Sequence, residues 1–288
     1  LGYDVLLEHN PKLILVSLTG FGQDGPYAHF KAPDIVTTAL GGLLYISGDP
    51  DLPPCMPPES QSYYFSSIFA AYGVMLALWQ RETRGIGAHI DLSVQASMAL
   101  HEHVAFNCAA EGRVMKRAGS QHQHNAPANL FQCKNGYIAL FVTQNHWPIF
   151  LKIWNDHPAE LDDPKWINNN LRRANAEMIN AMVTSYTSRF LKEDLAHLMQ
   201  KNGIPALPVN SPSDFMSDPH IRERGFFAAV THPVLGSFEQ PVPPFVVNGN
   251  RLTTGPAPLL GQHNHEVFCG ELGLAKRELE VLATGGVI

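Results

Sequence analysis

The sequence lacks several features that mark whole classes of protein. Only 16% of its 288 residues are charged, and 20 Lys and Arg stand against 26 Asp and Glu, which gives a net charge of −6. Because nucleic-acid binding depends on neutralising phosphates with Lys and Arg, this balance argues against a nucleic-acid partner. With 45% hydrophobic residues and no low-complexity tract, the chain is not a disordered tail either.

Cysteine is scarce as well. The four residues, Cys55, Cys108, Cys133 and Cys269, lie far apart and form no C-x-x-C pair, which excludes a disulfide scaffold and favours a reduced, cytoplasmic location. We interpret them as small buried hydrophobic residues, with a reactive thiol as the alternative. We expect that no segment is apolar over the roughly 20 residues needed to span a bilayer, and therefore that the protein has no membrane partner.

The first third of the chain has the pattern of an α/β unit. Residues 13–18 predict a fully buried strand, residues 20–27 a glycine-rich loop, and residues 34–45 a helix. Residues 49–58 contain five prolines and cannot be regular structure. A long helix follows over 60–84, ending at Gly85, and its apolar residues on most faces predict burial on more than one side.

The period of the pattern changes near residue 115. A short strand over 89–92 and a helix over 94–110 precede two alternating stretches on either side of Lys134-Asn135-Gly136, where Asn-Gly is a strong hairpin signal. The remaining elements are expected as helices over 145–155, 174–190 and 193–202, a strand over 204–209, a β-like region over 226–247, and helices over 264–272 and after 275.

Three sets of motifs, in order along the chain, resemble one known family. They are Leu1-Gly2-Tyr3 followed by Asn10-Pro11-Lys12-Leu13-Ile14 and Gly20-Phe21-Gly22-Gln23-Asp24-Gly25-Pro26-Tyr27, then residues 78–91, then Ala257-Pro258-Leu259-Leu260-Gly261-Gln262-His263 with residues 271–274. Together they resemble the class III acyl-CoA transferases of the CaiB/BaiF type. The resemblance implies that part of the family's N-terminal sequence would precede Leu1.

The resemblance also implies a fold and an assembly. We expect an α/β protein with a Rossmann-like larger domain, a smaller α+β domain and an interlocked-ring dimer. The corresponding boundaries are 1–114 for part of the larger domain, 115–225 for the smaller domain, and 226–288 for a C-terminal segment that returns to the larger domain.

Family transferases use an aspartate that attacks the thioester and carries CoA to an acceptor acid. By resemblance, its position lies 18 residues before Arg81, where this sequence has Tyr63. The nearest acid is Glu59, four residues earlier and on the same face if the helix extends that far. Glu59 is therefore the candidate nucleophile, with an ordinary exposed Glu at a helix N-terminus as the alternative. Tyr63 itself is interpreted as a packing residue with one hydrogen bond.

Related racemases need a His and an Asp on opposite sides of the acyl α-carbon. By resemblance these would fall near Pro33 and near Ser62 or Tyr63, and both positions are unsuitable. Asp34, next to the first position, is interpreted as a helix N-cap.

Coenzyme A is expected as a substrate, with no permanently bound cofactor. Lys31 resembles a family lysine beside the bound CoA, where its charge would face the phosphates, and Gly22 and Gln23 lie in the adjoining loop. A solvated surface lysine is the alternative. Gln121 and His122 fall where relatives place a mobile loop over the active site. His122 and His124 lack the Cys or carboxylate partners of a metal site, so we expect no metal.

The sequence thus favours a subunit that moves CoA between an acyl-CoA thioester and a carboxylic acid, as a homodimer or paired with a second family subunit. The open alternatives are a catalytically silent subunit, a non-catalytic acyl-CoA binder, and an acyl-CoA racemase. The acyl group and the acceptor cannot be read from these residues.

Overall fold

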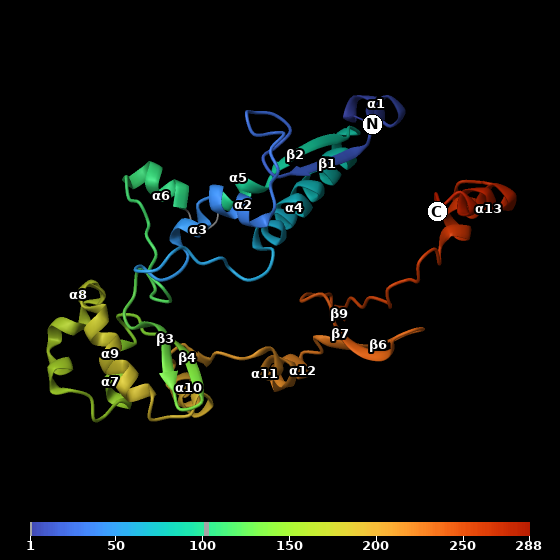
Figure 1. The fold of residues 1–288 in the computed structure, drawn as a ribbon. Helices are drawn as coiled ribbons and strands as arrows, with labels where there is room; N and C mark the ends of the chain where they lie inside the picture. The colour runs from blue at the N-terminus through green and yellow to red at the C-terminus, as the bar shows by residue number, and fades with distance from the viewer. Residues whose placement is uncertain (1, 101–103) are drawn as a thin grey trace. The chain divides into compact units, whose positions relative to one another are not determined.

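The computed structural model describes residues 2–100 and 104–288. Its contacts divide the chain into two compact units, Leu1–Val209 and Asn210–Ile288. Figure 1 shows the helices and strands of both units. The domain boundaries near residues 115 and 226 remain predictions.

The first unit contains a parallel pair of strands, β1 (Ile14–Thr19) and β2 (Ala88–Ser93). A parallel pair needs a crossover connection, which here consists of α2 (Asp34–Leu40), α3 (Leu43–Ile46) and α4 (Gln61–Arg84), while α1 (Tyr3–His9) precedes β1. In Figure 1, β1 and β2 lie side by side and α4 runs along them. The carboxyl ends of both strands therefore meet at one edge, where the glycine-rich loop begins.

The observed helix α4 confirms the helix predicted over 60–84 and its end at Gly85. Gly85 follows it at φ 72°, a left-handed conformation that glycine adopts without strain. A Cβ on Gly73 would meet the Ile90 side chain at 3.4 Å, so this face of α4 packs on β2.

The opposite face of α4 is apolar and exposed, with Ile68 at 68%, Tyr72 at 65% and Trp79 at 70%. Burial of the helix on more than one side is therefore wrong for this chain, because only one face meets β1, β2, α2 and α5. Among the described residues α4 is also the one helix that is long and apolar enough to cross a membrane by length and composition. The expectation that no apolar run approaches that length is wrong.

Two further local predictions need correction. Strand β1 is only partly buried, and Leu18 is exposed, because α4, the helix that packs on the two-stranded sheet, leaves part of β1 uncovered. The helix predicted over 34–45 is broken into α2 and α3 at Gly42, which has φ 90°. A Cβ on the preceding Gly41 would lie 2.3 Å from the Met98 side chain, so the break allows α2 to end closely against α5 (Val94–Ala99).

The helix predicted over 94–110 lies partly outside the described residues. The structure has α5, which Ser93 caps by accepting from the Ala96 N–H at 3.2 Å, and α6 (Val104–Glu111). Residues 101–103 are not described.

A second sheet in the first unit confirms the predicted hairpin. Strands β3 (Ala128–Cys133) and β4 (Gly136–Phe141) pair antiparallel around the Lys134-Asn135 turn, and β5 (Ala206–Pro208) adds to β4. The helices of this part are α7 (Trp147–Ile153), η2 (Ala159–Asp162), η3 (Pro164–Ile167), α8 (Asn169–Ala174), α9 (Ala176–Thr187) and α10 (Lys192–Lys201). Buried aromatic and aliphatic side chains from the sheet and these helices form one core, which includes Phe131, Ile138, Trp147, Phe150, Tyr186 and Leu195.

The second unit consists of short elements. They are α11 (Pro212–Ser217), α12 (Pro219–Glu223), the hairpin β6 (Phe227–His232) and β7 (Gly236–Pro241), the pair β8 (Val246–Val247) and β9 (Asn250–Arg251), the helical segment η4 (His265–Glu271) and α13 (Lys276–Thr284). Ser211 and Asp214 form a reciprocal capping box at the start of α11. The predicted β-like region and terminal helices are confirmed as elements.

All four cysteines are free thiols in the structure. Cys133 is buried, and burial followed by the nearby Glu193 charge raises the pKa of its thiol. Cys55 and Cys108 are exposed and Cys269 is half-buried. The interpretation as small buried residues is therefore correct for Cys133 only, because the local sequence does not report what packs over a side chain.

Tyr186 provides a stability test of the core. Its ring stacks on Trp154 with centroids 5.0 Å apart, while no described residue offers its buried hydroxyl a hydrogen-bond partner. Burial raises the pKa of Tyr186 to about 12. Since an unpaired buried hydroxyl costs about 1–3 kcal/mol, Tyr186→Phe should leave the free energy of unfolding unchanged or raise it by about 1 kcal/mol in urea denaturation.

Tyr186→Leu is the matched control, because it removes the hydroxyl together with the ring. Loss of the aromatic contacts should lower stability by about 2–4 kcal/mol. A clear loss of stability in Tyr186→Phe would mean that the hydroxyl is bonded in solution.

Candidate functional site

The N-terminal end of α4 gathers the first group of predicted residues. The Asp34 carboxylate oxygen Oδ1 accepts the Ser62 backbone N–H at 2.9 Å and the Ser62 hydroxyl at 2.5 Å. The Thr37 hydroxyl lies 3.0 Å from the Ser62 hydroxyl, and both side chains are buried. A carboxylate in this position satisfies an unpaired N–H of the first helical turn and is stabilised by the helix dipole.

Asp34 is therefore a cap, but for a different helix from the expected one. It is the first residue of α2, whose own N-cap is Pro33 without a side-chain bond. Its carboxylate instead caps α4, 28 positions later in the chain. Local sequence gives no sign of this partner, because the contact depends on how α2 packs against α4.

Tyr63 lies next to this cap. Its hydroxyl donates to the Ala32 carbonyl oxygen at 3.3 Å, and the residue is 40% exposed. The single side-chain hydrogen bond agrees with the interpretation of Tyr63, whereas its exposure does not agree with the packing part of that interpretation.

Glu59 is exposed and precedes the helix, with φ 60°. The helical spacing that would place it on the same face as Tyr63 therefore does not apply, because α4 begins only at Gln61. Its role as nucleophile remains a prediction.

The glycine-rich loop follows β1 at the carboxyl edge of the sheet. Gly22 has φ 94°, and its N–H donates to the Thr19 hydroxyl at 3.0 Å. The Gln23 N–H donates to Asp91 Oδ2 at 3.0 Å. Both amides are thus bonded within the protein, and these two bonds fix the shape of the loop rather than leaving the amides open to a phosphate.

Lys31 is exposed directly after the loop. Its neighbour Phe30 is 60% exposed and packs on Tyr27 with centroids 4.9 Å apart. Because the Ala32 carbonyl accepts from Tyr63, the segment that carries Lys31 is tied to the start of α4. The structure thus joins the predicted CoA-binding lysine and the predicted catalytic position through one short segment.

Gln121 and His122 lie in a second group, on the segment that precedes β3. All polar atoms of the Gln121 side chain are used within the protein. Its Nε2 donates to the carbonyl oxygens of His122 and Asn125 at 3.1 and 2.9 Å. Its Oε1 accepts from Asn180 at 2.5 Å and from Asn129 at 3.4 Å. Gln121 therefore anchors this segment.

Five consecutive carbonyl oxygens of this segment accept hydrogen bonds from side chains. Gln121 binds those of residues 122 and 125. Arg173 binds the Gln123 oxygen at 3.1 Å, Asn169 binds the His124 oxygen at 2.6 Å, and Arg172 binds the Ala126 oxygen at 2.6 Å. We call residues 121–126 the anchored segment. Gating of a site by this segment remains a prediction.

Arg172 is the buried centre of these contacts. It is 0% exposed, and its guanidinium also donates to the Trp166 and Ile167 carbonyls and stacks 4.6 Å from the Trp147 ring. Burial lowers the pKa of Arg172 to about 10, so it is still a cation at neutral pH. Arg172 and Asn169 were not predicted as functional residues from the sequence, where only the polar Asn-Asn-Leu-Arg-Arg run of α8 marks them.

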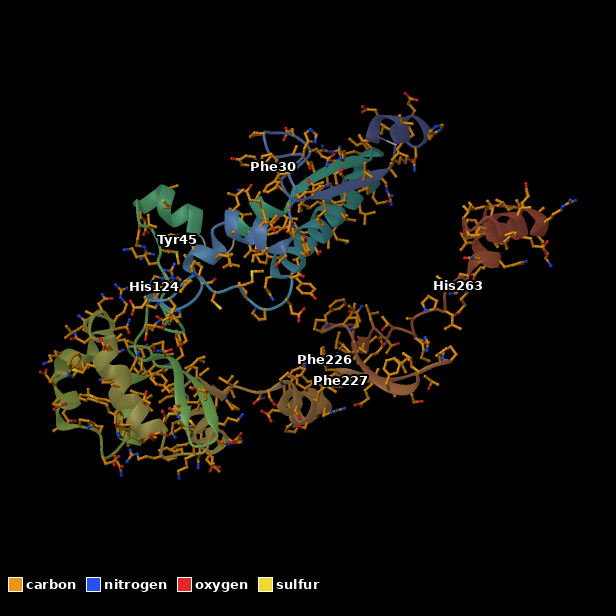
Figure 2. The ribbon with its side chains drawn as sticks, viewed as in Figure 1. Phe30, Tyr45, His124, Phe226, Phe227 and His263 are labelled. Atoms are coloured by element: carbon orange, nitrogen blue, oxygen red, sulfur yellow. The ribbon has the colours of Figure 1, made fainter. Side chains whose placement is uncertain are left out.

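A cavity of about 740 Å³ borders the anchored segment. Its walls come from α3, from residues 111–119 and from residues 121–124. Figure 2 shows His124 on the segment that leads into the second sheet, and Tyr45 on α3. Gln121 and His122 therefore line a cavity, whereas Asp34, Tyr63 and Lys31 belong to the first group around α4.

The chain belongs to CoA-transferase family III, because the model of that family matches residues 1–264. A crystal structure of a CaiB/BaiF family protein from Brucella suis matches with a TM-score of 0.79 and 25% identity, over 97% of this chain and 71% of that one. The family and the mixed α/β fold expected from the sequence are thereby confirmed.

Curated relatives agree. The chain is 31% identical over 294 residues to the succinyl-CoA:glutarate CoA-transferase of Mus musculus, and 31% identical over 294 residues to the succinyl-CoA–D-citramalate CoA-transferase of Chloroflexus aurantiacus. It is 30% identical over 305 residues to the succinyl-CoA–L-malate CoA-transferase beta subunit of Chloroflexus aurantiacus. All of this chain is matched, and it spans 66%, 72% and 73% of those proteins.

Substitution of Arg172 tests the anchoring. Arg172→Met should lower the free energy of unfolding by about 2–4 kcal/mol in urea denaturation, because the buried carbonyls lose their donor. Amide exchange over residues 122–126 should rise at the same time. Arg173→Met is the matched control, since Arg173 is exposed and its one bond among the described residues is to the Gln123 carbonyl, so a loss of stability of about 1 kcal/mol or less is expected. Equal losses in both variants would contradict a special role for Arg172.

Proposed function

We propose that this protein moves CoA between an acyl-CoA thioester and a carboxylic acid, with CoA as a substrate. The observation that supports this most directly is the family match over residues 1–264. The relatives named above are all CoA-transferases, which favours transfer over the racemase alternative. Their acids are glutarate, citramalate and malate, with succinyl-CoA as donor, so the acid proposed here is a small dicarboxylic acid.

The proposed assembly is a dimer built from a Rossmann-like larger domain and a smaller α+β domain. The exposed apolar face of α4 supports association, because a monomer rarely leaves such a contiguous face uncovered. The partner is a second copy or a second family subunit, and the relationship to a beta subunit supports the latter.

The proposed route is covalent. A carboxylate attacks the thioester carbonyl, CoA thiolate leaves, and a mixed anhydride forms; the thiolate then attacks the enzyme carbonyl, which releases the first acid and leaves an enzyme-bound CoA thioester. The acceptor carboxylate reverses these steps and takes the CoA. Glu59 is the proposed nucleophile, and the capping carboxylate of Asp34 lies at the same end of α4.

Glu59→Gln should lower the rate of CoA transfer from succinyl-CoA to glutarate by about 10³-fold or more, because a covalent nucleophile is lost. In the unsubstituted protein, borohydride or hydroxylamine treatment after incubation with succinyl-CoA should modify Glu59, as read by peptide mass spectrometry. Glu82→Gln is the matched control, since Glu82 is an exposed acid at the other end of α4, and its rate should be unchanged.

Other labelling patterns would overturn this assignment. Modification of Asp34 instead of Glu59 would move the nucleophile to the α4 cap, and Asp34→Asn, which keeps an oxygen acceptor for Ser62, should then abolish transfer. A normal rate in Glu59→Gln would remove Glu59 as the nucleophile. If no residue is modified and neither the unsubstituted protein nor Glu59→Gln transfers CoA, the protein has no covalent site of its own. Labelling gained in Tyr63→Asp would then indicate a silent subunit that lacks only its nucleophile.

Lys31 is proposed to contact the CoA phosphates. Lys31→Ala should weaken CoA binding by about 0.5–2 kcal/mol in calorimetry, and the difference should shrink at high salt. Lys12→Ala is the control, because Lys12 is an exposed lysine that precedes the N-terminal end of β1, whereas Lys31 follows the loop at its C-terminal end. Equal CoA affinities in the two variants would remove Lys31 from the site.

A further inference from the structure

The cavity beside the anchored segment combines an apolar floor with a basic rim. Leu43, Ile46 and Met115 line it, and Leu43 and Met115 are buried. Arg113, Lys116, His122 and His124 also line it, and of the described lining residues Glu111 is the acid. In a chain of net charge −6 this is a local concentration of basic groups. Most of the lining is polar, with Leu43, Ile46, Met115 and Ala118 as its apolar side chains, which suits a small polar ligand, and about 740 Å³ lies in the volume range of small-molecule sites.

The fold brings the basic residues together by reversing the chain. Arg113 and Lys116 precede Gly119, and the two histidines follow it. Gly119 has φ 58°, and its N–H donates to the Gly48 carbonyl at 2.9 Å. The reversal is thereby fixed against the end of α3, which forms the opposite wall.

Arg117 holds the same segment in place. Its guanidinium donates to the Asp49 and Tyr45 carbonyls at 3.1 and 3.2 Å. These bonds tie residues 115–119 to α3 and to the start of the proline-rich loop, and they leave the Lys116 side chain to line the cavity.

His122 presents a defined donor. Its Nδ1 accepts the His124 backbone N–H at 3.1 Å, so the neutral ring carries its proton on Nε2. The ring packs edge-on against Phe141 with centroids 5.0 Å apart. The anchored segment already has its carbonyls bonded to side chains, so this wall is ordered before any ligand arrives.

We propose that this cavity is the recognition site for a small dicarboxylic acid, with Lys116 and Arg113 binding one carboxylate. The apolar floor suits the methylene groups between the carboxylates, and His122 Nε2 adds a hydrogen-bond donor. The described lining residues offer imidazoles but no Phe, Tyr or Trp for stacking an adenine ring, which favours an acid over the nucleotide of CoA. The assignment rests on the proposed function for its place in catalysis, whereas the binding itself is measured without CoA.

The test is calorimetry at low salt with glutarate and with its monoamide, glutaramate, which has the same shape but one charge. The protein should bind glutarate at least about 5-fold more tightly than glutaramate. Lys116→Gln should reduce that ratio toward 1. Glu111→Gln should tighten glutarate binding by about 2-fold, because Glu111 lies 3.6 Å from Arg113 and competes for it. Lys201→Gln, an exposed lysine on α10, is the control and should change neither affinity.

Opposite outcomes overturn the proposal. Equal binding of glutarate and glutaramate, or a ratio that survives Lys116→Gln, removes the cavity as a dicarboxylate site. A third titration uses adenosine 3′,5′-bisphosphate as a probe for the nucleotide of CoA. If it displaces glutarate and its own affinity depends on Lys116, the cavity is a phosphate site instead.

The transfer assay separates this inference from the proposed function. Lys116-dependent glutarate binding without CoA transfer would support the cavity and contradict the transferase. Transfer to glutarate with a KM for the acid that Lys116→Gln leaves unchanged would support the transferase and contradict the cavity.

Discussion

The buried guanidinium of Arg172 organises the second sheet and the chain that enters it. A fully buried cation is costly unless its donors are satisfied, and here carbonyl oxygens and an amide, rather than a carboxylate, satisfy them. The same group stacks on Trp147 in the core. One side chain therefore links α8, the core and the anchored segment, so the orientation of the cavity wall depends on the packing of the helices behind it.

At the start of α4, too, a residue distant in the chain satisfies polar groups. A helix of 24 residues leaves N–H groups unpaired at its first turn, and the Asp34 carboxylate satisfies one of them from another helix. This bond fixes α2 against α4 and places Tyr63 beside the segment that carries Lys31. The sequence resemblance predicts a nucleophilic aspartate at the position of Tyr63. The carboxylate at this end of α4 belongs to Asp34, and it already accepts hydrogen bonds from Ser62.

Much of the secondary structure was predictable because it follows from local chemistry. Asn135-Gly136 specified the hairpin, Gly85 ended α4, and the alternating and helical periods located most strands and helices. Burial was predicted less well. Strand β1 and helix α4 have the composition of elements covered on both sides, but a two-stranded sheet with one helix layer covers each of them on one face only.

The sequence by itself determined the family, the order of the elements and the positions that its motifs mark, because these depend on residues close together in the chain. Only the tertiary structure decided which groups meet. Arg172 reaches Ala126 across 46 positions and Gln121 meets Asn180 across 59, and the basic rim of the cavity exists only because Gly119 reverses the chain against α3. Contacts of this kind arise from packing between elements, and no local pattern of residues encodes them.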